Sequence, residues 1–274
     1  MQEFRMPTRE QNSNKGSFGK VLCCCGSDNY IGAAYLSAFS ALKVGAGLVA
    51  LATVSQVINS VSASLPEAVY LTRAEGVDKI NNFSVVLIGC GLGSTNDSKI
   101  FLEQVLNKIH SDIPIIIDAD GLNLLSEFSA EQLKILKKLK KIIITPHPLE
   151  AARLLGKSLD SVLSNLEDSA KALCAKFNCV TVLKTHRTII CDTDFSIYTN
   201  NYGCSALAKA GTGDVLAGII SGLIAQGVCI FDASKLGVYL HSVTGEILAE
   251  ELTEYSVMAS DIPKNLYKAI KKCL

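Results

Sequence analysis

Residues 113–117 read IPIII, a short and almost wholly aliphatic run. Two runs of the same kind, FSVVLI at 83–88 and KIIIT at 141–145, lie before and after it in the chain. Continuous apolar runs of this length are typical of strands that are buried on both faces, as in a parallel sheet. The three runs therefore predict the centre of such a sheet.

Short apolar runs alternate with helical spacing on both sides of this centre. Further strands are predicted at 20–25, 47–53, 179–184, 187–191 and 195–199, and helices at 31–44, 96–109, 130–139, 212–226, 232–251 and 260–273. This alternation favours an α/β fold with a central, mostly parallel sheet. Because no repeat or linker divides the alternation, we expect a single domain over residues 20–274, preceded by a loose polar arm over residues 1–19.

The composition argues against several classes of protein. The chain has 274 residues, of which 49% are hydrophobic and 19% charged, so it is not a disordered chain. Its 26 basic and 26 acidic residues balance, which argues against a general nucleic-acid binder. The most apolar uncharged stretch, 215–231, is too short and too rich in glycine for a membrane span, so we expect a buried helix there. No signal-peptide pattern is found in residues 1–20, and a soluble cytoplasmic protein is expected.

The ten cysteines do not form a C-x-x-C pair, so the usual spacing of a zinc site is missing. A disulfide framework belongs to short secreted chains. We expect the cysteines to be small buried hydrophobic residues in a reducing compartment.

Chemically active residues follow the predicted strands. Gly89–Gly93 follows the run at 83–88, Asp118-Ala119-Asp120 follows 113–117, His147 follows 141–145 and Lys184 follows 179–183. In open α/β sheets, ligands bind beyond the carboxyl ends of the strands. The sequence therefore predicts an active site at that edge of the sheet.

The sharpest local motif is Ala210-Gly211-Thr212-Gly213-Asp214, directly before an apolar helix. Two glycines allow close backbone approach to a ligand, and the first turn of a helix attracts anions. A carboxylate beside such an anion hole can take a proton from a hydroxyl while the amides stabilise phosphoryl charge. Asp214 is therefore a candidate base, although Asp is also an ordinary N-cap residue.

The glycine-rich loop at 89–93 departs from the dinucleotide-binding fingerprint, since Ser94 stands where the third glycine is required. We interpret it as close backbone approach to a ligand. Lys184 is a candidate phosphate contact, or a solvated strand end. Asp118 and Asp120 hold site water or cap the next helix.

His147 lies between two prolines and binds substrate, or is an exposed imidazole in a helix-entry turn. Glu150 holds Mg²⁺ through water, or serves the helix dipole. His110 and His241 are interpreted as structural.

Six blocks together resemble the NAD(P)H-hydrate dehydratase family of the ribokinase-like superfamily. They are GSDNYIGAAYLSAFSALKVGAGLV (26–49), IGCGLG (88–93), IDADGLN (117–123), TPHPLEAARLL (145–155), AKAGTGDVLAGIISGLIAQG (208–227) and ASDI (259–262). The resemblance runs from about residue 20 to the C-terminus and implies a three-layer ribokinase-like catalytic domain. It also implies a repair reaction, in which ADP phosphorylates the hydroxyl of the S-epimer of hydrated NADH or NADPH. Phosphate then leaves, and the products are NAD(P)H, AMP and phosphate.

The resemblance also implies the roles of the site residues. Asp214 would be the base, and Gly211, Thr212 and Gly213 would form the anion hole. The residues lining the hydrated nicotinamide nucleotide would be Ala33, Gly91, Gly93, Asn123, His147 and Asp214. The adenine nucleotide would be held by Lys184, Thr185, His186, Arg187, Thr188 and Gly213. Glu150 would hold Mg²⁺, a separate protein would supply the epimerase, and a homo-oligomer such as a tetramer is implied.

The chain departs from the family pattern around the nucleotide. It has Lys184-Thr185-His186 where K-G-A is common, Leu149 in place of a glycine, Ala210 in place of a frequent glycine, and an altered stretch at 200–208. The ATP-dependent version of the reaction therefore stays open beside the ADP-dependent one. A ribokinase-like kinase acting on a vitamin precursor, a nicotinamide-dependent oxidoreductase using 88–94 and a non-catalytic nucleotide sensor are competing hypotheses.

Overall fold

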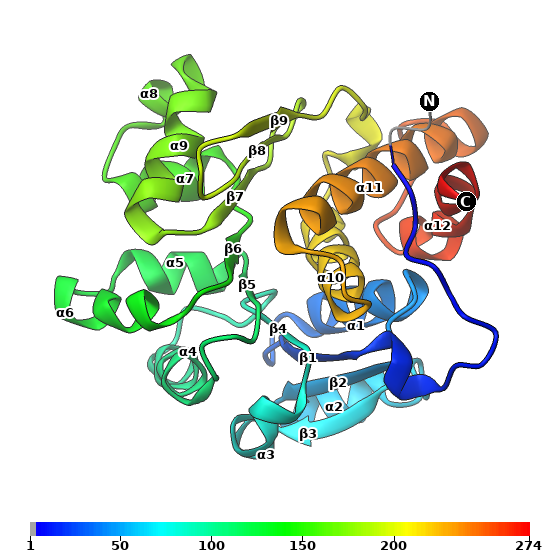
Figure 1. Ribbon diagram of the computed structural model, residues 1–274, viewed down its shortest axis with the longest axis horizontal. Helices are drawn as coiled ribbons and strands as arrows, with labels where there is room; N and C mark the ends of the chain where they lie inside the picture. Colours follow the sequence, from blue (N-terminus) through cyan, green and yellow to red (C-terminus); the bar gives the residue numbers. More distant parts are fainter. Residues whose placement is uncertain (1–3) are drawn as a thin grey trace.

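The computed structural model describes residues 4–274, and within them a single nine-stranded sheet runs through the molecule in the order β3-β2-β1-β4-β5-β6-β7-β8-β9 (Figure 1). Strands β1 to β7 pair in parallel, whereas β8 and β9 form antiparallel hairpins at one edge. The strands are β1 (Lys20–Cys24), β2 (Leu48–Thr53), β3 (Val69–Thr72), β4 (Val85–Ile88), β5 (Ile115–Ile117), β6 (Ile142–Ile144), β7 (Val180–Leu183), β8 (Ile189–Cys191) and β9 (Ile197–Thr199). The predicted α/β fold with a mostly parallel sheet is confirmed.

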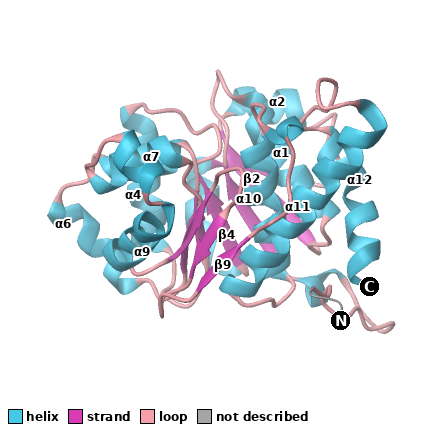
Figure 2. Cartoon of the chain, turned by 90° about the horizontal axis from the view of Figure 1, so that it is seen from above, coloured by secondary structure: helices cyan, strands magenta, loops and turns pink. Residues whose placement is uncertain are grey.

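Helices cover both faces of the sheet, so the fold has three layers (Figure 2). One face packs against α1 (Ile31–Lys43), α2 (Ser55–Val61), α10 (Thr212–Ala225), α11 (Ile230–Leu252) and α12 (Asp261–Ile270). The other packs against α3 (Arg73–Lys79), α4 (Asn96–Lys108), α5 (Asp120–Ser126), α7 (Pro148–Leu155), α8 (Leu159–Ser164) and α9 (Leu166–Phe177). A short helix, α6 (Ala130–Leu133), lies at the periphery.

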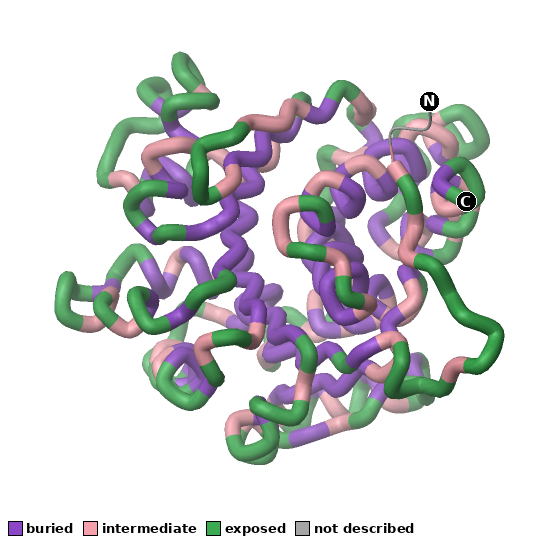
Figure 3. The backbone as a smooth tube through the Cα atoms, in the orientation of Figure 1, coloured by how far each residue is buried: buried purple, intermediate pink, exposed green. Residues whose placement is uncertain are grey.

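The central strands are buried from end to end, as the apolar runs predict (Figure 3). Successive side chains alternate between the two cores: Ile116 belongs to the core under α10, and Ile115 and Ile117 to the core under α4. A strand that supplies both cores must be apolar at every position, because its side chains alternate across the sheet.

Eight of the ten cysteines are buried and all ten are free thiols, which confirms the interpretation as buried hydrophobic residues for most of them. Cys204 is partly buried and Cys229 is exposed. The buried helix predicted over 215–231 is confirmed for α10, which ends at Ala225; the rest of that span is a partly exposed turn and the first two residues of α11. None of the helices in residues 4–274 is long and apolar enough to cross a membrane.

Several elements are absent from the sequence-based prediction. Strand β3 has mostly exposed or half-buried residues, and it therefore lacks the apolar run of a central strand. The sequence pattern does not predict the helices α2, α3, α5, α8 and α9, and the helix predicted at 130–139 is α6 followed by a 3₁₀ turn at Lys134–Lys138. Helices α2, α3, α5 and α8 have only six or seven residues, so periodicity cannot separate them from loops. Helix α9 has twelve residues and buries Ala170, Cys174 and Phe177 at helical spacing, so its sequence carries a helical pattern that the prediction lacks.

Parts of the arm predicted as loose pack against the body of the protein, although most of residues 8–17 are exposed. The Phe4 ring lies 4.7 Å from the Tyr239 ring, measured between centroids. The Met6 amide donates to the Cys273 carbonyl at 3.0 Å. A 3₁₀ turn at Lys15–Phe18 then leads into β1. Tertiary contacts therefore order a segment whose own sequence is polar.

Helix α10 lies unusually close to α1, because it presents glycines at the contact. A Cβ atom built on Gly218 would lie 2.3 Å from the carbonyl oxygen of Ser37. One built on Gly222 would lie 2.3 Å from a methyl carbon of Val44. This close packing fixes the position of the first turn of α10 relative to the sheet.

The contact between α1 and α10 gives a stability prediction. Gly218→Ala should lower the free energy of unfolding by about 1–3 kcal/mol, because the added methyl group overlaps backbone that must move. The matched control is Gly32→Ala in α1, where a Cβ meets nothing within 4 Å. The control should leave the free energy unchanged or raise it by up to about 1 kcal/mol. Urea denaturation measures both; an unaffected Gly218→Ala variant would show that the helices are not tightly held there.

Candidate active site

Three neighbouring parallel strands place one polar group each at their carboxyl ends. Asp118 follows β5, Thr145 follows β6 and Lys184 follows β7. Asp118 Oδ1 accepts hydrogen bonds from Thr145 Oγ1 and from Lys184 Nζ, each at 2.6 Å. Both Asp118 and Thr145 are about 1% exposed. The predicted edge therefore carries a buried and fully paired carboxylate.

The Gly-Thr-Gly-Asp motif faces this group from α10. Gly211 is the N-cap residue with φ +91°, a conformation that favours glycine. The Thr212 hydroxyl lies 2.8 Å from the carbonyl oxygen of Leu207, which anchors the turn to the preceding loop. A Cβ built on Gly213 would lie 3.4 Å from Lys184 Nζ. The ammonium therefore lies beside the open first turn of the helix, where backbone amides attract anions.

Asp214 lies in that first turn, since α10 begins at Thr212. The pKa of its carboxyl is raised to about 7, first by burial and then by the charge of Asp118. Lys184 and Cys90 act in the opposite direction, and Asp120 adds a smaller raising effect. A carboxyl group that titrates near neutral pH is suited to accept a proton during a reaction. It makes no side-chain capping bond to its helix, so the N-cap interpretation does not account for it.

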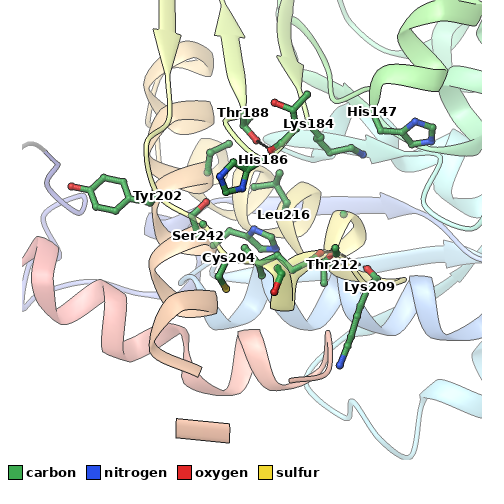
Figure 4. A pocket seen from close by; sticks show the side chains of 18 residues that line it. His147, Lys184, His186, Thr188, Tyr202, Cys204, Lys209, Thr212, Leu216 and Ser242 are labelled. Carbon is green, nitrogen blue, oxygen red and sulfur yellow. Dashed lines mark hydrogen bonds between the residues drawn. The ribbon is translucent and has the colours of Figure 1, made fainter. Parts of the chain in front are cut away.

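A cavity of about 530 Å³ opens beside this turn (Figure 4). Seven of the residues predicted for the site line it: His147, Lys184, Thr185, His186, Thr188, Thr212 and Gly213. Arg187, Gly211 and Asp214 are also predicted for the site, but they are not part of the lining. The loop at 184–188 is closed on itself, since the Thr188 hydroxyl donates to the Thr185 carbonyl at 3.2 Å. The volume of the cavity suits a small-molecule ligand.

More than half of the cavity lining, 11 of its 18 residues, is not among the predicted site residues. They are Tyr202, Gly203, Cys204, Ser205, Leu207, Ala208 and Lys209 from the loop before α10, Leu216 from α10, and Val238, His241 and Ser242 from α11. His241, interpreted from the sequence as structural, is buried in this wall, and burial lowers the pKa of its imidazole to about 4. Helix α11 has the apolar pattern of a core helix, so only the departure from the family pattern at 200–208 could have drawn attention to this wall.

A second set of predicted residues lies outside this cavity. Gly91 has φ +60°, and a Cβ built on it would lie 2.6 Å from the Cβ of Ala33. The Gly93 amide donates to Asp120 Oδ2 at 2.8 Å. Asn123 Oδ1 accepts from Arg153 at 2.8 Å. The glycine-rich loop is predicted to approach a ligand closely, but at Gly91 the close neighbour is Ala33 of the protein itself.

His147 and Glu150 are joined in the first turn of α7. The His147 amide donates to Glu150 Oε2 at 2.8 Å, and His147 Nδ1 accepts from the amides of Leu149 and Glu150. Burial lowers the pKa of His147 and raises that of Glu150. Glu150 is only 4% exposed, and its oxygens lie 2.8 Å from the His147 amide nitrogen and 3.3 Å from His147 Nε2.

The mostly parallel sheet, with a glycine-bounded helix start and its aspartate at the carboxyl edge, defines the chain as a ribokinase-like α/β protein. The particular family follows from its sequence. The chain belongs to the NAD(P)H-hydrate dehydratase family, whose model matches residues 21–268.

Known relatives agree with this assignment. The ADP-dependent (S)-NAD(P)H-hydrate dehydratase of Neisseria meningitidis is 37% identical over 88% of this chain and 81% of its own length. The bifunctional NAD(P)H-hydrate repair enzyme Nnr of Coxiella burnetii is 36% identical over 94% of this chain, which spans about half (51%) of that relative. The structure of the Bacillus subtilis ADP/ATP-dependent NAD(P)H-hydrate dehydratase, co-crystallised with ATP/Mg²⁺, matches 98% of this chain and 95% of its own, with 29% identity and a TM-score of 0.86.

The raised pKa of Asp214 gives a prediction about stability. The folded protein holds this proton up to about pH 7, whereas an unfolded chain releases it near pH 3.9. The free energy of unfolding of the wild type, relative to Asp214→Asn, should therefore fall as the pH rises from about 4 to about 7. Denaturation at several pH values measures this.

The control for this measurement is Asp112→Asn. Asp112 is exposed, and its pKa is lowered, chiefly by its hydrogen bond to Lys140. Its stabilising effect is present above the unfolded pKa and is lost only in acid, so this variant should show no trend between pH 5 and 8. A trend of the same sign and size in both variants would contradict the assignment to Asp214.

Proposed function

We propose that the protein dehydrates the S-epimer of hydrated NADH or NADPH, with ADP as the phosphoryl donor and with AMP and phosphate as by-products. Membership of the NAD(P)H-hydrate dehydratase family and the names of relatives over most of the chain support this reaction. The observation that carries it is the position of Asp214, a carboxyl with a pKa of about 7, in the turn that faces Lys184.

Asp214 would take the proton from the ring hydroxyl as the oxygen attacks the terminal phosphorus of the nucleotide. The bond between that phosphorus and the bridging oxygen breaks, and AMP leaves with the electron pair. The amides of the Gly211–Gly213 turn and the Lys184 ammonium would hold the negative charge of the transferred group. The phosphate ester then loses phosphate from the ring carbon and a proton from its neighbour, which restores the double bond.

The cavity would hold the adenine nucleotide, with its phosphates directed toward Gly213. The lining residues Lys184, Thr185, His186 and Thr188 support this placement, and Arg187 would contact the nucleotide from the same loop. The second set, Ala33, Gly91, Gly93 and Asn123, together with His147, would contact the hydrated nicotinamide nucleotide. Both ligands would then meet at Asp214.

Magnesium would accompany the nucleotide and neutralise phosphate charge. Glu150, whose oxygens lie beside His147, is the residue that would hold it through water.

A separate epimerase that acts on the other isomer is part of the same proposal; this chain spans about half the length of the bifunctional relatives (51% and 52%). A homotetramer and a cytoplasmic location are part of the same proposal, and ten free thiols suit a reducing compartment.

The reaction is tested by incubating the protein with hydrated NADH, Mg²⁺ and either ADP or ATP. Reduced-nicotinamide absorbance should recover, with one phosphate released per ring restored, and the rate should rise with pH up to about 7. Asp214→Asn should lower kcat by about 10²–10⁴-fold, since it removes the general base. Asp112→Asn is the surface control and should retain full activity. Recovery with neither nucleotide would refute the function; a stable phosphate ester would indicate a small-molecule kinase instead.

The role of Glu150 is tested by its isosteric variant. Glu150→Gln should raise the Mg²⁺ concentration needed for half-maximal rate by about tenfold, because a neutral amide attracts the ion less strongly. Ser158→Ala, which removes a capping hydroxyl at the start of the next helix, is the control for a change in local stability. An unchanged Mg²⁺ requirement, together with a lower melting temperature, would limit Glu150 to capping α7.

A further inference from the structure

The Asp118 carboxylate takes no direct part in the proposed reaction, yet it is the most fully bonded acidic group at the sheet edge. It is about 1% exposed. Its Oδ1 atom accepts from Lys184 and Thr145, and its Oδ2 atom lies 3.7 Å from the thiol of Cys90. Four adjacent strands, β4 to β7, thus contribute to its surroundings at their carboxyl ends.

The backbone holds this carboxylate in one place. The Asp118 amide donates to the Ile88 carbonyl at 3.1 Å, which extends the pairing of β4 and β5 beyond the strands. The next residue, Ala119, has φ +48°, a conformation that is strained for a residue other than glycine. A Cβ on Gly89 would lie 2.0 Å from the Asp118 carbonyl oxygen, so the two turns interlock. Strain of this kind persists where the surrounding structure holds it, often at a functional site.

The pair of Asp118 with Lys184 has little value as a stabilising contact alone, since burying both charges offsets most of their attraction. Its location suggests another purpose. The 2.6 Å bond holds the ammonium beside Gly213, 3.4 Å from the position where a side chain would begin. Because Gly213 has no side chain, this space is open to a ligand. Burial acts to lower the pKa of Lys184, but Asp118 and Glu150 outweigh it, and the pKa is raised, so the amine stays charged.

We propose that Asp118 is a positioning residue for phosphoryl transfer: its carboxylate holds the Lys184 ammonium at the Gly213 turn, where the transferred phosphoryl group meets a fixed positive charge. The inference rests on the proposed function and adds a residue to it. A lysine side chain has several rotatable bonds, and a fixed ammonium is worth more to a transition state than a mobile one.

Asp118 also acts on Asp214 directly. One carboxylate oxygen of each, together with Cys90 Sγ, lie within 4.8 Å of one another. The charged and titratable groups that face Asp214 are Asp118, Asp120, Lys184 and Cys90. If only the charge of Asp118 is removed, the Lys184 ammonium becomes the dominant charge acting on Asp214. The Asp214 carboxyl should then titrate at lower pH.

The test compares Asp118→Asn with Asp112→Asn, an identical change at the opposite end of β5, where Asp112 also pairs with a lysine. In Asp118→Asn, kcat should fall about 10- to 100-fold, while KM for ADP should change less than about threefold, because the change removes a carboxylate and not a phosphate ligand. The acid limb of the kcat/KM profile should move to lower pH. Asp112→Asn should match the wild type. Wild-type kcat and pH profile in Asp118→Asn would overturn the proposal.

A double-mutant cycle with Lys184→Met tests whether Asp118 acts through the lysine. If it does, the double variant should have a kcat less than about threefold below that of Lys184→Met, although each single substitution lowers kcat strongly. A double variant whose loss equals the product of the two single losses would overturn the positioning role. If Asp118→Asn does not fold, Thr145→Val replaces it, because Thr145→Val removes the other hydrogen bond that orients the Asp118 carboxylate. Thr145→Val should lower kcat and shift the pH profile in the same directions, by smaller amounts. A wild-type kcat and pH profile in Thr145→Val would count against the proposal.

The same variants separate this proposal from the function on which it rests. Calorimetry gives the ratio of Kd values for AMP and ADP, which reports contacts to the terminal phosphate without turnover. If the wild type binds ADP but restores no hydrated NADH, the proposed function is wrong. The Kd ratio for AMP and ADP then still tests whether Asp118 positions Lys184. Lys184→Met should weaken the binding of ADP relative to AMP by more than Asp118→Asn does. Asp118→Asn should change the ratio by less than about threefold, and only where Lys184 is present. Additive effects on the ratio, or no binding of ADP by the wild type, would overturn the pairing.

Discussion

Parallel pairing of the strands from β1 to β7 is the constraint on which the site depends. Because parallel strands all point the same way, their carboxyl ends meet at one edge, and the residues that follow them become neighbours. Asp118 and Lys184 are 66 positions apart in the chain, yet their side chains share a hydrogen bond of 2.6 Å. The antiparallel hairpins of β8 and β9 come only after β7, so they close the sheet without interrupting this edge.

Charge in the site is concentrated in a few buried groups that influence one another. Asp118 is paired with Lys184, and Asp214 faces both from the first turn of α10. A buried carboxylate without a partner is costly in its charged form, which is why burial raises the pKa of Asp214 while that of the paired Lys184 remains high. The site therefore contains a proton acceptor near neutral pH and a permanent cation a few ångströms from an open glycine turn.

The position of that turn is set further along α10, where the helix contacts α1. Gly218 and Gly222 let the helix approach α1 so closely that a methyl group would overlap backbone or side-chain atoms. Helix α1 also carries Ala33, which packs against Gly91 at the end of β4. One compact contact therefore links the glycine-bounded first turn of α10, the glycine-rich loop and the sheet. The aspartate reaches the sheet edge because small residues, spaced along two helices, allow it.

The central strands, most of the long helices and the chemistry at the strand ends follow from local sequence, because 83–88, 113–117 and 141–145 carry strong local patterns and GTGD is a local motif. Resemblance to a family added the expected roles of Gly91, His147 and the 184–188 loop. Tertiary structure alone decided which of these side chains meet. The pairing of Asp118 with Lys184, the placement of His241 in the cavity wall and the ordering of the polar arm on Tyr239 and Cys273 depend on contacts between distant segments. The local sequence pattern predicts which face of a helix or strand is buried, but it does not predict which other segment packs against that face.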